Sequence, residues 1–147
     1  TARFVQATGD RAPAWPTEIL ARLRVITDAS LEFLASEPDQ YRLFTSFMEG
    51  EAVHLRDQFL RTRMPDGLAT WARWFEGVDA EDFRAPPDDV RGVLSWVVAG
   101  VKLESFSRLG SAGTPADLRT LLLGRLDRAI PLLAQAIYRN PADHGYP

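Results

Sequence analysis

The chain of 147 residues contains no cysteine, so a disulfide framework and a thiolate metal site are both excluded. Lysine is almost absent: the 17 basic residues are 16 arginines and one lysine. They form no basic block and the net charge is −3, so the sequence lacks the electrostatic footprint of a nucleic-acid-binding surface. Long apolar runs are missing as well. The longest uncharged one, from Val93 to Val101, is far shorter than a bilayer span, and no signal-peptide pattern opens the chain.

Strand-length segments that alternate apolar and polar residues are also lacking. Apolar residues instead recur at spacings of three and four, interrupted by proline and glycine, which is typical of successive helices. The first long helix opens at Trp15-Pro16-Thr17-Glu18 and stops before Pro38. The pattern predicts an all-α fold, an orthogonal bundle of about six helices in one domain over residues 1–147. The tail at residues 141–147 is expected to be flexible.

The last two helices are the most apolar. The first is predicted from Pro87 to about Leu109, and its centre, "VLSWVVAGV", carries no charge on any side. A helix that is apolar all round must be covered all round. The second opens at Thr114, with proline next and an acid at the third helical position, which is a strong start signal. Pro131 lies inside it and predicts a kink near Asp127.

This helix pair has more apolar surface than one small bundle needs. A second copy would cover it, giving a homodimer in which two helices per subunit form a four-helix interface. The alternative is that the pair is the central hairpin of a monomer. The residues predicted to lie in the dimer interface are Val97, Gly100, Val101, Leu118, Leu122, Leu126, Ala129 and Leu133.

Catalytic or metal-binding chemistry has little support in the sequence. Glu51 and His54 are three residues apart, the spacing with which di-iron bundle proteins hold their metal, but such a site needs two of these pairs and two further glutamates. No nucleophile elbow or phosphate-binding loop is present. We therefore expect no enzyme and no cofactor. A small metal-dependent helical enzyme and a ligand-free interaction module remain as alternatives.

Large aromatic residues are the most prominent group left. "ATWARWFEG" alone, residues 69–77, places three rings within five residues, between a possible N-cap at Asp66 and a C′ glycine at Gly77. Such a face usually belongs to the core, but rings on several helices can also enclose an apolar pocket. The residues predicted to bind a ligand are Phe44, Phe47, Met48, His54, Phe59, Trp71, Phe75 and Trp96.

The order of these segments resembles the C-terminal regulatory domain of the tetracycline-repressor-like (TetR) family of transcription regulators. "LARLRVITDASLEFLASEPDQYRLFTSFM", "WARWFEGVDAEDFRAPPDDVRGVLSWVVAGVKLESF" and "GTPADLRTLLLGRLDRAIPLL" are similar to that family's layout between Ile19 and Ile137. The resemblance implies a cytoplasmic bacterial repressor, a homodimer formed through its last two helices, and a small apolar effector bound between the middle helices. DNA would be bound only through an N-terminal helix-turn-helix, which is absent from these residues. The first residues, Ala2 to Ala7, look like the end of a helix already under way, as expected for a piece of a longer protein.

Overall fold

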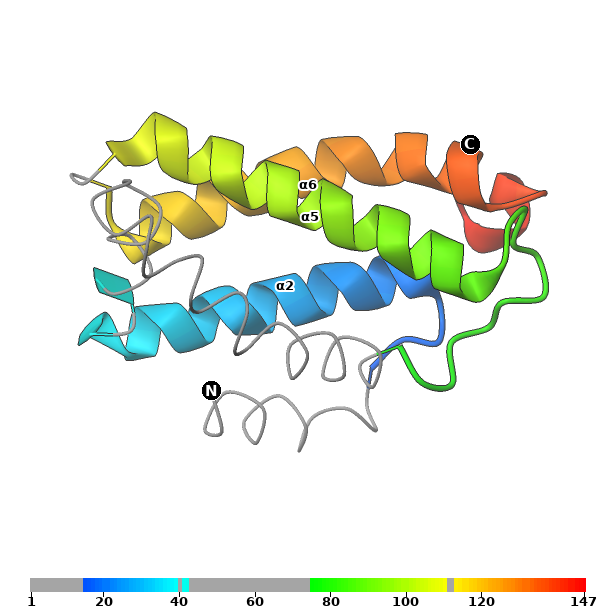
Figure 1. Ribbon diagram of the computed structural model, residues 1–147, viewed down its shortest axis with the longest axis horizontal. Coiled ribbons are helices and arrows are strands. Elements are labelled where there is room, and N and C mark those ends of the chain that lie inside the picture. The colour runs from blue at the N-terminus through cyan, green and yellow to red at the C-terminus, as the bar shows by residue number, and fades with distance from the viewer. Residues whose placement is uncertain (1–14, 40, 43–74, 111–112) are drawn as a thin grey trace.

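The computed structural model describes residues 15–39, 41–42, 75–110 and 113–147. In these ranges the chain forms three long α-helices and a short 3-10 helix (Figure 1): α2 (Ile19–Ser36), α5 (Pro87–Leu109), α6 (Pro115–Ile137) and η3 (Pro141–His144). The same ranges contain no strand and only one isolated antiparallel bridge, between Phe83 and Tyr138. The expected all-α class is confirmed over this part of the chain. The count of six helices and their orthogonal arrangement involve residues outside it.

Among the three long helices, the closest packing is that of α6 with α2 and of α6 with α5. Figure 1 shows that α2 and α5 run in the same direction and that α6 runs in the opposite direction. Consecutive α5 and α6 therefore form an antiparallel hairpin, and α2 lies along one side of it. This arrangement leaves another side of the hairpin facing away from α2.

The helix ends follow the predicted capping signals. The Thr114 hydroxyl accepts a hydrogen bond from the Asp117 backbone N–H at 3.2 Å, and the Asp117 carboxylate accepts one from the Thr114 N–H at 3.1 Å. This reciprocal capping box satisfies N–H groups that the first turn of α6 leaves free. At the end of α5, Gly110 has a positive φ of 58° and donates its N–H to the Phe106 carbonyl. Both boundaries of the hairpin loop are thus set by local chemistry.

Pro131 does not end α6, which continues from Pro115 to Ile137. A proline inside a helix removes one backbone hydrogen bond and leaves the carbonyl four residues earlier, here that of Asp127, without its usual donor. Both Pro131 and Asp127 are exposed, so water can satisfy this carbonyl. The kink predicted near Asp127 stays a prediction.

Two apolar clusters fill the space between the helices. The larger lies where α2 and α5 begin and α6 ends, and it also takes in Phe75 and Phe83 from the segment before α5. The smaller lies towards the hairpin loop and consists of Leu31, Phe106, Leu118 and Leu122. Burying a leucine or phenylalanine side chain contributes about 1.5–3 kcal/mol, so these clusters account for most of the packing between the described helices.

Four leucines predicted to form the dimer interface lie in this core. They are Leu118, Leu122, Leu126 and Leu133. Leu122, for example, exposes only 1% of its surface within the single chain. Within the single chain, residues of α2 and α5 cover this stripe. That the stripe faces a second copy stays a prediction, as does the alternative of a central hairpin in a monomer.

The other residues predicted to lie in the dimer interface differ in how far they are buried in the single chain. Val97, Val101 and Ala129 are partly buried and pack against the two apolar clusters. Gly100 is exposed on the outer side of α5. A second copy would therefore have to contact a different face of the hairpin, one that includes Gly100.

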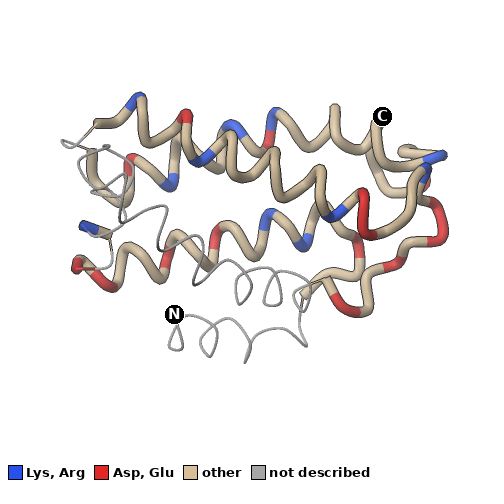
Figure 2. The backbone as a smooth tube through the Cα atoms, viewed as in Figure 1, with Lys and Arg blue, Asp and Glu red and all other residues tan. Residues whose placement is uncertain are grey.

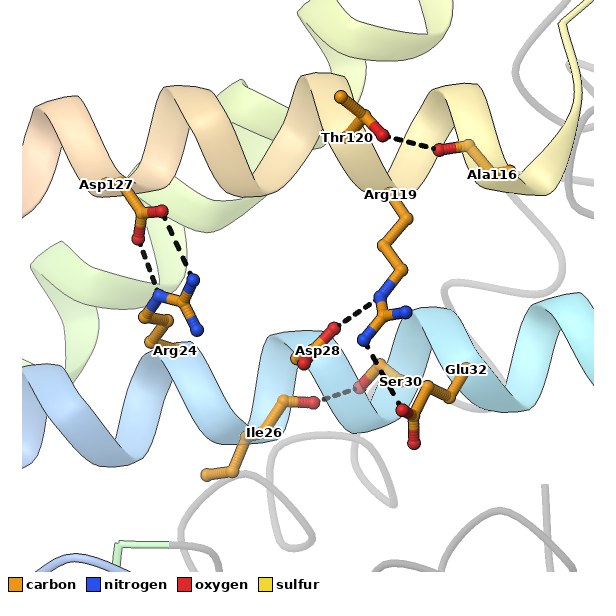
Figure 3. A network of polar contacts seen from close by, with 9 residues as sticks. All are labelled: Arg24, Ile26, Asp28, Ser30, Glu32, Ala116, Arg119, Thr120 and Asp127. Carbon is orange, nitrogen blue, oxygen red and sulfur yellow. Dashed lines mark hydrogen bonds and ion pairs between the residues drawn. The ribbon is translucent and has the colours of Figure 1, made fainter.

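Ion pairs join α2 to α6 along their common edge (Figure 3). Arg24 forms two hydrogen bonds to the Asp127 carboxylate, at 2.7 and 3.3 Å, and Arg119 contacts Asp28 at 2.6 Å and Glu32 at 3.4 Å. These side chains are partly exposed, and such pairs contribute only about 0–1 kcal/mol each. Their order along the two helices fixes the antiparallel register more than it stabilises the fold.

The C-terminal segment, which was predicted to be flexible, makes several contacts with the rest of the molecule. The His144 ring stacks on Tyr138 with centroids 3.8 Å apart, and His144 Nε2 lies 3.3 Å from the Asp82 carboxylate. The Tyr146 hydroxyl donates to Glu18 at 2.9 Å, and Gln135 donates to the carbonyl of Pro147 at 2.7 Å. Proline and glycine in the tail suggested a loose end, but its two rings find partners on α2 and α6.

Candidate functional site

The residues predicted to bind a ligand are divided between described and undescribed parts of the chain. Phe44, Phe47, Met48, His54, Phe59 and Trp71 lie outside the described residues, as does Glu51. Phe75 is 2% exposed and belongs to the larger apolar cluster. Trp96 is 77% exposed on α5. The structure thus places these two rings apart, one in the core and one on the surface.

A cavity of about 240 Å³ adjoins Phe75. It lies among the start of α2, the start of α5 and the segment between residues 75 and 83, and Gly77 in its wall has a φ of +71°. Its lining is Ile19, Phe75, Glu76, Gly77, Val78, Ala80, Phe83, Pro87 and Arg91. Typical small-molecule pockets measure roughly 300–1,000 Å³, so this cavity suits at most a small ligand.

Arg22 holds the wall of this cavity to α2. Its side chain, 6% exposed, donates from Nε to the Pro16 carbonyl at 2.5 Å and from a terminal nitrogen to the Glu76 carbonyl at 2.6 Å. Burial lowers the pKa of the Arg22 guanidinium below its ordinary value. Two backbone carbonyls therefore bind this buried cation and join the turn at Glu76 to the first helix. This role is structural, because both donors already have partners.

Glu18 forms a second polar centre, at the N-terminus of α2. Its carboxylate accepts hydrogen bonds from the backbone N–H groups of Leu20 at 2.9 Å and Ala21 at 2.6 Å. It also accepts from the hydroxyls of Tyr138 and Tyr146. Burial, followed by the hydrogen bond to Glu18, raises the pKa of both tyrosines. An anion at a helix N-terminus is favourable, so this carboxylate caps α2 and anchors the C-terminal segment at once.

The outer side of α5 is apolar and uncovered. Val93, Trp96, Gly100 and Leu103 follow one another at spacings of three, four and three, so they form one stripe of the helix. Trp96 and Leu103 are 77% and 56% exposed. The middle of α5, between Arg91 and Lys102, has no charged residue, as Figure 2 shows, so no charged side chain interrupts the middle of this stripe. Exposed apolar surface of this kind marks interaction sites.

The stripe continues towards α6. Arg125 of α6 pairs with Glu104 of α5, which identifies the sides of the two helices that face each other. On α6, Leu121 and Leu132 lie on nearly the same side as Arg125, since positions four and seven residues apart share one helix face. Leu132 is 74% exposed. The outer face of the hairpin, defined here as Val93, Trp96, Gly100 and Leu103 of α5 with Leu121 and Leu132 of α6, is therefore apolar along α5, whereas on α6 Arg125 and Arg128 lie between the two leucines.

The inner side of α5 carries the only lysine of the chain. Leu94, Val98, Lys102 and Phe106 are four residues apart and form a row on this side. Leu94 and Val98 belong to the larger apolar cluster and Phe106 to the smaller one, so Lys102 lies where the two clusters meet along α5. Lys102 is partly buried, and this burial lowers its pKa below the ordinary value of 10.5.

Sequence reasoning missed both Lys102 and the Glu18 centre. Lys102 had a visible signal, because it is the one lysine in the chain and falls four residues after Val98 in an apolar row. The Glu18 centre had none: its tyrosines lie 120 and 128 residues away along the chain, and only folding brings them to α2.

The described ranges contain neither a candidate metal site nor a helix that could span a membrane. No three histidine, aspartate or glutamate residues there are grouped so as to hold a metal ion. None of the described helices combines the length and the apolar character that crossing a membrane requires. Comparison of the chain with protein-family models, curated proteins and solved structures gives no match. The resemblance to the TetR family therefore rests on the layout of the sequence.

Proposed function

We propose that this chain is the effector-binding and dimerisation domain of a TetR-like transcriptional regulator. In this proposal the domain forms a homodimer through the α5–α6 hairpin and binds a small, mostly apolar molecule between its middle helices. Binding would favour one spacing of DNA-reading domains that are not among these residues, which couples two distinct sites.

The single observation that carries the proposal is the apolar outer face of the hairpin. Exposed apolar surface of this kind marks interaction sites, and the stripe runs along α5 with Leu132 of α6 exposed as well. A two-fold axis across such a face would place four helices together, with Trp96 of each copy near its centre. The proposed interface therefore uses the two helices that the resemblance implies, but the side of them that the core leaves free.

Gly100 supports a close approach of two helices at this face. A Cβ atom built on Gly100 would meet nothing within 4 Å in the single chain, so the monomer does not require glycine here. A glycine in a helix interior lowers helix stability by about 1 kcal/mol relative to alanine. Close packing of a second backbone against Gly100 would explain why it is there.

Sedimentation velocity tests the dimer directly. We expect a dimer at micromolar concentration, and a monomer throughout that range would contradict the proposal. A thermal-shift screen with apolar compounds tests the effector site, since a ligand that binds the native state raises the melting temperature. If the protein is a dimer but no compound shifts its melting temperature, a ligand-free interaction module becomes the better description.

A further inference from the structure

We propose that Lys102 is an anion-binding group of the effector site, so that the effector is an amphipathic molecule with an apolar body and one carboxylate. This inference rests on the proposed function and narrows it from any apolar molecule to organic acids. It depends on the position of Lys102, on the absence of a counter-charge among the described residues and on the cost of burying an ammonium group without a partner.

The position of Lys102 separates it from the outer face. Trp96 and Lys102 are six residues apart, so their side chains leave α5 about 120° from each other. The residues one turn before and after Lys102 in its row, Val98 and Phe106, are both buried in the apolar clusters. Lys102 itself is only partly buried, in contrast to both of these neighbours.

No carboxylate in the described part of the chain neutralises Lys102. The acids along the neighbouring helices are already paired: Asp28 with Arg119, Asp127 with Arg24, and Glu104 with Arg108 and Arg125. Within the described residues Lys102 takes part in no hydrogen bond or ion pair. Burial lowers its pKa below the ordinary value.

An unpaired ammonium group in such a position destabilises the protein, because its desolvation is not compensated. A carboxylate supplied by a ligand would remove this penalty and gain a charge-assisted hydrogen bond in a surrounding of low polarity. The apolar neighbours of Lys102 would at the same time favour an alkyl or aromatic body. A monocarboxylate meets both conditions, whereas a purely apolar compound leaves the lysine unpaired.

Calorimetric titration of the full chain with straight-chain alkanoates from octanoate to tetradecanoate, each compared with the 1-alkanol of the same length, tests this inference. The variants are Lys102→Met, Lys102→Arg and the control Arg128→Met, which removes one positive charge from the exposed side of α6. We expect Lys102→Met to weaken alkanoate binding roughly 10- to 100-fold, as loss of a hydrogen bond to a charged group does, with alkanol binding unchanged. Lys102→Arg should keep most of the alkanoate affinity, and Arg128→Met should keep all of it.

The outcomes separate the two proposals. If alkanols bind but alkanoates bind no better, or if Lys102→Met leaves alkanoate binding unchanged, the assignment of Lys102 is wrong while the apolar effector site stands. If neither series binds at any chain length, the proposed effector function fails together with the inference. If Lys102→Met does not fold, equal alkanoate affinity of wild type and Lys102→Glu would still overturn the assignment.

Discussion

Replacing Trp96 with alanine separates folding from association, because its ring is on the surface of the single chain. Trp96 is 77% exposed and contacts little of the core. Surface substitutions of this kind change the free energy of unfolding by at most about 0.5 kcal/mol, and alanine is the better helix former. We therefore expect Trp96→Ala to leave the stability of the monomer unchanged or slightly raised.

The effect on a dimer should be large. A tryptophan side chain presents on the order of 200 Å². With 77% of the residue exposed, about 150 Å² per copy could be buried, an upper limit of about 4 kcal/mol at ~25 cal/mol per Å². Association costs reduce this value, and central tryptophans in interfaces contribute about 2 kcal/mol or more. Because a two-fold interface contains two copies, the loss is about 4 kcal/mol, or about 1,000-fold in Kd.

Sedimentation velocity over a concentration series measures this Kd, and guanidinium chloride unfolding at low concentration measures the monomer. Val25→Ala is the matched control, since Val25 is an exposed apolar residue on α2. Leu122→Ala is the contrasting variant. Leu122 is 1% exposed, so its truncation should lower the free energy of unfolding by about 2.7–5 kcal/mol without any dependence on dimer formation.

The reverse result would refute this reasoning. If Leu122→Ala abolished the dimer while leaving the folded monomer intact, the leucine stripe would face a second copy after all. If Trp96→Ala and Val25→Ala changed the dimer equally little, the outer face would not be the interface. Either outcome would also remove the main support for the proposed dimerisation domain.

Further predictions concern single groups. Glu18→Ala removes four hydrogen bonds, from two backbone N–H groups and two tyrosine hydroxyls, and should lower the free energy of unfolding by about 2–4 kcal/mol. Tyr146→Phe removes only one of these bonds and should lower it by about 1 kcal/mol. Equal effects of the two variants in denaturant titration would contradict the central role of Glu18. Gly100→Ala should stabilise a monomeric form by about 1 kcal/mol while weakening the dimer, and a variant that gains both stability and association would count against close helix approach at this position. Lys102→Met should be more stable than wild type near pH 7. Burial lowers the pKa of Lys102 in the folded state, so over a range of alkaline pH the unfolded chain keeps the Lys102 proton that the folded chain has lost. The free energy of unfolding of the wild type therefore rises with pH in this range. Its deficit relative to Lys102→Met should shrink as the pH rises towards the ordinary pKa of 10.5. The raised tyrosine pKa values are common to both proteins and cancel, and a difference independent of pH between 7 and 11 would show that the charge of Lys102 is not its cause.

Helix boundaries were largely predictable because they depend on neighbouring residues. The proline at Pro87, the capping box from Thr114 to Asp117 and the glycine at Gly110 set the ends of α5 and α6 through backbone hydrogen bonds within a few residues. The contacts of the tail, from Tyr146 to Glu18 and from His144 to Asp82, join residues far apart in sequence, so no local pattern predicts them.

The candidate site was less predictable. Periodicity identifies which residues share a helix face, but not which neighbour covers that face. For this reason Leu122 was assigned to a dimer interface and Trp96 to a ligand site. In the single chain Leu122 lies in the core and Trp96 on the surface. Lys102 was overlooked because a single charge within an apolar helix attracts attention only when its neighbours are known.

The sequence by itself determined the helical class, the starts and ends of α5 and α6, and the excess of apolar surface on them, since these follow from local hydrogen bonding and from residue spacing. Only the tertiary structure decided how that surface is divided. Packing of α2 against α6 covers the leucine stripe and leaves Trp96 and Leu103 exposed. It also places Lys102 between two apolar clusters and the hydroxyls of Tyr138 and Tyr146 on Glu18. These outcomes depend on contacts between distant segments, and no local pattern encodes them.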